Sequence, residues 1–158
     1  MRPVAAALVV SVTVAAVVLL LAACGGPSSG ASIAEQVQSW VRTTGLDASL
    51  RTLEADGQRA RVVAANTDAV GLRTVCDVLV TDALGANQNL PSPDASLTSI
   101  LTAAYRAAAA AGQGCVHGSG PQHGLSARVN GELAAARAGY VKAQARVDLV
   151  ELPGGAAS

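Results

Sequence analysis

Aromatic side chains are scarce in this chain of 158 residues, which contains no phenylalanine, one tryptophan and two tyrosines. Its core must therefore be built from alanine, valine and leucine, and alanine has the highest intrinsic helix propensity. The alternation of apolar and polar residues that marks half-buried strands is also missing from the sequence. This composition favours an all-α fold of closely packed helices.

An excess of either charge is missing too, because 11 basic residues balance 11 acidic residues. Proteins that bind nucleic acids need a basic face, so we expect no nucleic-acid partner. Lysine occurs only at Lys142. Such a strong preference for arginine hints at a GC-rich genome, for example that of an actinobacterium.

Motifs that carry well-known chemistry are not found. The sequence has no phosphate-binding glycine loop, no C-x-x-C pair and no Glu-x-x-His pair of the kind that holds metals in helical bundles. Asp77 and Asp82 are expected on different faces of one helix, as solvated charges. We therefore predict that the protein is not an enzyme and has no catalytic residues, no metal ligands and no cofactor.

The two histidines leave one alternative open. His117 and His123 lie in a segment rich in glycine, and we expect them to be solvated loop side chains. Together with Cys115 they could instead hold zinc, although a clear fourth ligand is missing. The alternative function is therefore a small envelope metal-handling protein or enzyme that uses His117 and His123.

A long apolar run opens the chain. Residues 4–20 consist almost wholly of valine, alanine and leucine, follow Arg2, and lead into Leu21-Ala22-Ala23-Cys24. This arrangement is typical of a signal peptide. The tetrad resembles the lipobox of bacterial lipoproteins, in which the cysteine receives a diacylglyceryl group and becomes the N-terminus after cleavage.

The resemblance implies a signal peptide (1–23) and a lipidated Cys24, which is followed by a flexible tether (24–31). The rest of the sequence predicts a helical domain (32–152) and a disordered tail (153–158). Acylation of Cys24 would bind the protein to membrane lipid at the extracytoplasmic face of the cell membrane. Two alternatives are a transmembrane helix over residues 4–23 and an ordinary secretory signal with an incidental cysteine.

Apolar residues recur every three or four positions through the 32–152 region, as in an antiparallel bundle of four or five helices. Ser32 and Glu35 form a capping box, and Gly45 ends the first helix. Cap-type residues at 66–68 separate a second helix from a third, although one bent helix is an alternative. Ser92 is expected to cap a fourth helix, and a fifth starts at Leu125. The connections 85–93 and 116–124 are expected to be non-helical.

Cys76 and Cys115 lie on the apolar seams of the third and fourth helices, on either side of the proline-rich connection. Export would place them in an oxidising compartment, where such a pair forms a disulfide. The two helices then make an antiparallel hairpin, and the extended segment 87–93 must run along the bundle axis to make up their difference in length. A redox pair and a metal site are alternatives, but neither has its usual spacing. We predict a structural disulfide.

The stretch from Cys76 to Cys115 resembles uncharacterised actinobacterial helical proteins that are secreted or lipid-anchored. In these a cysteine, a Leu-Pro-x-Pro-Asp turn and a second cysteine recur, and here the turn is Leu90-Pro91-Ser92-Pro93-Asp94. The resemblance supports the hairpin and implies no activity. We therefore expect a lipid-anchored, non-catalytic binding or scaffolding module whose partner is an unknown envelope protein or ligand.

Overall fold

The first helix begins at the predicted capping box. Glu35 donates its backbone N–H to the Ser32 hydroxyl oxygen (3.3 Å), and Ser32 donates its N–H to the Glu35 carboxylate (2.8 Å). In the computed structural model, which describes residues 30–118 and 124–152, helix α1 (Ile33–Thr44) ends at Gly45. Gly45 has a left-handed φ of 63°, which glycine adopts without strain, and the chain turns there into α2 (Leu46–Ala65).

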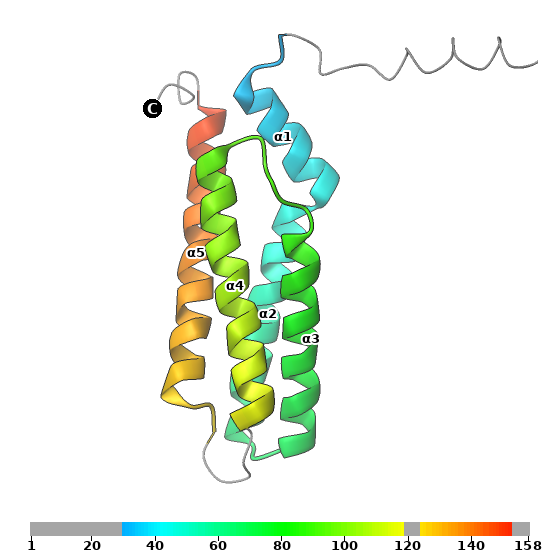
Figure 1. Cartoon of the computed structure of the whole chain (residues 1–158), viewed down its shortest axis with the longest axis vertical. Coiled ribbons are helices and arrows are strands. Elements are labelled where there is room, and N and C mark those ends of the chain that lie inside the picture. Colours follow the sequence, from blue (N-terminus) through cyan, green and yellow to red (C-terminus); the bar gives the residue numbers. More distant parts are fainter. Residues whose placement is uncertain (1–29, 119–123, 153–158) are drawn as a thin grey trace, which may run out of the picture. The chain divides into compact units, whose positions relative to one another are not determined.

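Three further helices complete an all-α, antiparallel bundle, which confirms the predicted fold class (Figure 1). They are α3 (Ala69–Asn87), α4 (Ala95–Gly118) and α5 (Ala127–Glu151). Helix α4 packs against both α3 and α5, and α2 packs against α3. Helix α1 contacts α5 near the end of the bundle at which α4 begins (Figure 1).

The break between α2 and α3 is real, so the alternative of one bent helix is wrong. Thr67 has a φ of 55°, which a helix cannot contain. Asp68 then caps α3 by accepting a hydrogen bond from the backbone N–H of Gly71 (2.9 Å).

Small side chains bring the helices close together in the core. At Gly112 on α4, a Cβ atom would lie 2.8 Å from the carbonyl oxygen of Cys76 on α3. At Gly139 on α5, it would lie 2.6 Å from the Cβ atom of Ala104 on α4. Glycine at these positions allows a backbone approach that alanine would block. The few bulky groups of the core include Tyr105 and Tyr140, both buried.

Several predicted boundaries are wrong. Helix α3 continues through Gly85 to Asn87, and α4 continues through residues 116–118, because a glycine inside a helix costs only about 1 kcal/mol and tertiary packing outweighs it. Helix α5 begins at Ala127 with Ser126 as its cap, two residues later than predicted. Residues 119–123 and 153–158 lie outside the described residues, as do 1–29 with the predicted signal peptide and Cys24.

The segment from Ser32 onward forms one compact unit. None of the helices in its described part combines the length and the apolar composition needed to cross a membrane.

Candidate functional site

The predicted disulfide joins α3 to α4. Cys76 and Cys115 are bonded, with their Cα atoms 6.0 Å apart and both residues buried. Cys115 lies three residues before the end of α4, so the bond is far from the proline-rich connection, which precedes the first residue of α4. The metal-site alternative required a free Cys115 sulfur as a ligand, whereas here the two sulfurs are bonded to each other and hold two helices together.

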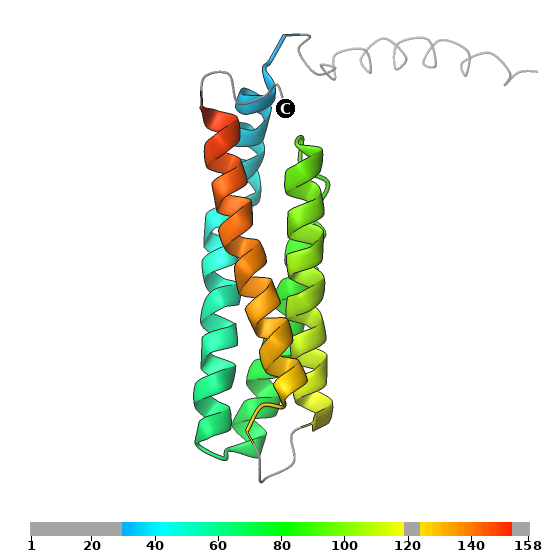
Figure 2. The ribbon, with the colours of Figure 1, turned by 90° about the vertical axis from the view of Figure 1, so that its left-hand side faces the viewer.

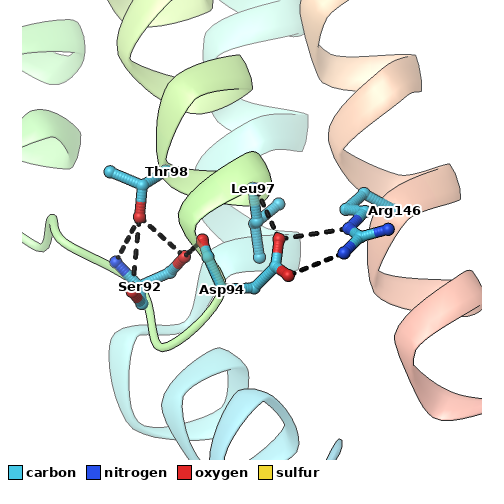
Figure 3. A network of polar contacts seen from close by, with 5 residues as sticks. All are labelled: Ser92, Asp94, Leu97, Thr98 and Arg146. Carbon is cyan, nitrogen blue, oxygen red and sulfur yellow. Dashed lines mark hydrogen bonds and ion pairs between the residues drawn. The ribbon is translucent and has the colours of Figure 1, made fainter. Parts of the chain in front are cut away.

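A network of polar contacts surrounds the proline-rich connection (Figure 3). Asp94 accepts a hydrogen bond from the backbone N–H of Leu97 (2.6 Å), so it caps α4 directly. Its carboxylate also accepts two bonds from the Arg146 guanidinium on α5, from Nε (3.1 Å) and Nη2 (2.8 Å). One carboxylate thus starts α4 and ties it to α5. The expectation that Ser92 would be the cap is wrong, because α4 begins at Ala95, directly after Asp94.

Ser92 holds the connection in place instead. Its backbone N–H donates to the Thr98 hydroxyl (2.9 Å), and its own hydroxyl donates to the carbonyl oxygen of Asp94 (2.7 Å). Trp40 on α1 donates its indole N–H to the carbonyl oxygen of Asn89 (3.1 Å). Side chains from α1, α4 and α5 therefore fix a segment that runs along the bundle axis, as the predicted difference in length required (Figure 1).

The charges at this site stabilise each other. Arg146 donates to the Asp94 carboxylate and, despite an opposing effect of burial, lowers the pKa of Asp94 below its usual value. The same bonds raise the pKa of Arg146. The two groups are mostly shielded from water, with 9% and 19% of their side chains exposed. A bidentate, charge-assisted ion pair of this kind holds α5 and the start of α4 in a fixed arrangement.

A second polar group lies inside the bundle at Asp56 on α2. Only 2% of this residue is exposed, and its Oδ1 atom accepts a hydrogen bond from Arg59 (3.0 Å). Its Oδ2 atom has no hydrogen-bond partner among the described residues. Burial raises the pKa of Asp56, and the nearby carboxyl group of Asp82 on α3 raises it further. The prediction that Asp82 is merely a solvated charge is therefore wrong, since Asp82 is half-buried beside another acid.

Both tyrosines belong to the same interior. Burial raises the pKa of Tyr105 to about 12, against a smaller opposing effect of a hydrogen bond with Ser49. Burial also raises the pKa of Tyr140, with further contributions from Tyr105 and Asp56. The Tyr140 hydroxyl is buried and has no partner within the described part of the chain. These phenols stay protonated at neutral pH, so they pack as core residues that carry a polar end.

His117 lies at the end of α4 and is exposed. It borders an open groove of about 430 Å³ between α4 and α5, together with Gln113, Arg128 and Glu132. His123 lies outside the described residues, so the predicted histidine pair is not brought together by them. Within residues 30–118 and 124–152, no three histidine, cysteine or acidic side chains are grouped as metal ligands.

A second open groove of about 520 Å³ lies between α5 and the junction of α1 and α2. Val41 and Val147 provide its apolar part, and Asp47, Arg51 and Asp148 are among its charged residues. Both grooves are open to solvent and carry mixed charges. Such surfaces suit contact with another molecule better than enclosure of a small substrate.

Sequence reasoning missed the Asp94–Arg146 pair and the buried Asp56. Arg146 lies 52 residues from Asp94, and only the packing of α5 against α4 brings the two together. Asp56 did carry a signal, because it lies three residues after Leu53 and four before Ala60, both on the apolar seam of α2. An acid on a seam predicts a buried carboxyl group.

Comparison of the chain with protein-family models, with curated proteins and with solved structures gives no match.

Proposed function

We propose that this protein is a lipid-anchored, extracytoplasmic helical bundle that acts as a non-catalytic binding or scaffolding module at the cell envelope. The observation that carries the proposal is the buried Cys76–Cys115 disulfide. Structural disulfides persist in oxidising compartments and are rare in the cytosol. Leu21-Ala22-Ala23-Cys24, at the end of the apolar run, supports attachment through a diacylglyceryl group on Cys24.

The binding part of the proposal is supported by how the polar side chains of the bundle are used. Asp94 binds Arg146 on α5, and Ser92 binds Thr98 on α4. The polar side chains around the proline-rich connection therefore serve to hold the bundle together. The groove beside α5, with Val41 and Val147 among charged residues, offers a mixed surface to a partner.

Intact mass of protein extracted from membranes tests the anchor and the compartment together. We expect a chain that starts at Cys24 and carries a diacylglyceryl group, with two more cysteines alkylated only after reduction. Replacement of Cys24 by alanine should remove the lipid mass and leave the disulfide unchanged. A chain that retains residues 1–23, or free thiols at Cys76 and Cys115, would contradict the proposal.

The binding surface can be tested in cells with a photo-reactive amino acid at Gln144, which lines the groove beside α5. The matched control is the same substitution at the exposed Arg73 on α3. We expect cross-linking to an envelope component from position 144 and not from 73. Equal cross-linking from both positions would exclude the groove as a binding site.

A second candidate, a metal-handling protein or enzyme, is favoured only by the position of His117 beside a groove that also contains Glu132. Metal analysis of protein purified without a histidine tag distinguishes the two functions. Stoichiometric zinc or copper that disappears in the His117→Ala/His123→Ala double variant would favour the second candidate over the first.

A further inference from the structure

Helix α5 is apolar on two opposite faces. Its inner face packs into the bundle through Val129, Leu133 and Tyr140. Its outer face is exposed and carries an apolar line of residues without a charged member, which we call the outer stripe. The outer stripe consists of Gly131, Ala134, Ala138, Val141, Ala145, Leu149 and Leu152.

The outer stripe leaves large aliphatic groups in solvent. Val141 is 61% exposed, Leu149 52% and Leu152 58%. Figure 2 shows α5 in front of the bundle, with no other helix over this face. A surface helix normally has one apolar face, directed at the core, so a second face of aliphatic residues spaced three or four apart points to another helix as its partner.

The order of residues in the stripe matches a second copy of itself running in the opposite direction. Leu152 and Gly131 lie equally far on either side of the bond between Val141 and Lys142, and so do Leu149 and Ala134. Ala138 and Ala145 form a third such pair. Two antiparallel copies centred on that bond would therefore place each leucine opposite a glycine or alanine.

Large residues opposite small ones allow two helices to interdigitate at an even distance. A parallel pair would instead set leucine against leucine at one end and glycine against glycine at the other. The stripe itself contains no charged residue. The same symmetry places Lys142 opposite Val141 of the other copy, at the edge of the contact, where its long side chain can reach solvent.

We propose that the outer stripe of α5 is a homodimer interface, in which two copies of this chain pack antiparallel about the bond between Val141 and Lys142. The contact is isologous, because each copy contributes the same residues.

The size of the stripe sets the strength of the dimer. From Gly131 to Leu152 it is about 32 Å long, so the contact covers roughly 300–500 Å² per copy, against about 800 Å² for a standard interface. Association is therefore weak between freely diffusing copies. Association becomes effective when copies are concentrated at a membrane, which depends on the proposed lipid anchor.

Site-directed cross-linking of the full chain in the cells that produce it tests the arrangement. Val141→Cys lies next to its own copy across the two-fold axis, so a short bis-maleimide should yield a covalent dimer. Leu152→Cys lies about 31 Å from its copy and should not react with itself. Differently tagged Gly131→Cys and Leu152→Cys chains should react with each other. The unsubstituted chain controls for reaction through Cys24.

A charge in the stripe should prevent association. Ala138→Glu, added to Val141→Cys, should lower the yield of covalent dimer about tenfold or more, because the carboxylate would be buried opposite Ala145 of the other copy. The matched control is Ala103→Glu on α4, which is exposed and lies outside the stripe. Both positions are solvent-exposed in the single chain, so neither change should unfold it.

Three results would overturn the proposal. These are no dimer from Val141→Cys, self-reaction of Leu152→Cys as efficient as that of Val141→Cys, and a product in which Val141→Cys is joined to another protein or to lipid. Intact mass reports separately on the anchor. A lipidated protein that does not cross-link would therefore contradict the dimer alone.

Discussion

Asp94 shows how one side chain can fix two helices. Its carboxylate caps α4 through the N–H of Leu97 and binds Arg146 on α5 with both oxygen atoms. The sequence shows this acid directly after the proline-rich connection, where the dipole of a following helix favours a negative charge. It could not predict Arg146, because a pair separated by 52 residues depends on tertiary packing.

The variants Asp94→Ala and Asp94→Asn distinguish the contribution of the N-cap to stability from that of the ion pair with Arg146. We expect Asp94→Ala to cost at least the roughly 1 kcal/mol of a lost N-cap, and Asp94→Asn to cost less because its amide oxygen still accepts from Leu97. The free energy of unfolding from urea titrations measures both. Equal losses in the two variants would mean that the cap contributes nothing.

The Asp94 pair also predicts a pH dependence. Arg146 lowers the pKa of Asp94 in the folded chain, so this carboxylate contributes stability above its unfolded pKa of about 4 and loses that contribution as the pH falls below this value through the lower folded pKa. The stability advantage of the parent over Asp94→Asn should therefore shrink between pH 6 and about pH 3. An advantage that stays constant over this range would contradict the assignment.

Asp56 predicts the opposite trend. Burial and Asp82 raise its pKa in the folded chain, so its contribution to stability is fully present at low pH and is lost as the pH rises through the folded pKa. The stability of Asp56→Asn relative to the parent should increase as the pH rises from about 4 to 7. Asp47→Asn, a matched change at an exposed position of α2, serves as the control. A relative stability of Asp56→Asn that falls with pH would show that Arg59 outweighs burial.

At the scale of the helices, small residues set the distances between neighbours. Gly112 lies against the backbone of Cys76 and against Val80, beside the disulfide that joins the same two helices. The apolar spacing in the sequence predicted an antiparallel bundle of four or five helices and their order. It did not predict that Gly85 and residues 116–118 remain helical, because tertiary packing outweighs the cost of about 1 kcal/mol for a glycine inside a helix.

Gly112→Ala tests this close approach. A Cβ atom would lie 2.8 Å from the carbonyl oxygen of Cys76 and 2.6 Å from a methyl group of Val80, so α3 and α4 would have to separate. We expect a loss of about 1–3 kcal/mol by thermal or urea unfolding. Gly85→Ala is the control, because its Cβ atom would meet nothing within 4 Å. That change should stabilise the helix by up to about 1 kcal/mol. Similar effects of the two changes would show that α3 and α4 can separate without cost.

At the scale of the whole molecule, the disulfide compensates for a core of small side chains. Alanine, valine and leucine supply most of the buried surface, and each alanine buries little area. The pairing of Cys76 with Cys115 was predictable because both lie on the apolar seams of two helices that are joined by a turn that reverses the chain. The interior acid and the outer stripe of α5 are not needed for that pairing and became apparent only from the packing of the helices.

Replacement of both bonded cysteines by alanine should destabilise the fold by about 4 kcal/mol, from closure of a loop with a sequence separation of 39 residues. Thermal unfolding of the Cys76→Ala/Cys115→Ala variant measures this loss. The parent with and without reductant provides the comparison. A variant as stable as the oxidised parent would show that the helices pack equally well without the covalent bond.

The same bond makes residues 76–115 a covalent ring that contains the exposed residues Asn87, Gln88 and Asn89. A protease that cuts the backbone once within this ring releases no fragment. The nicked molecule keeps its mass, apart from one added water, and its two pieces separate only after reduction. Proteolysis in an oxidising envelope would therefore leave the two halves of the bundle attached to each other.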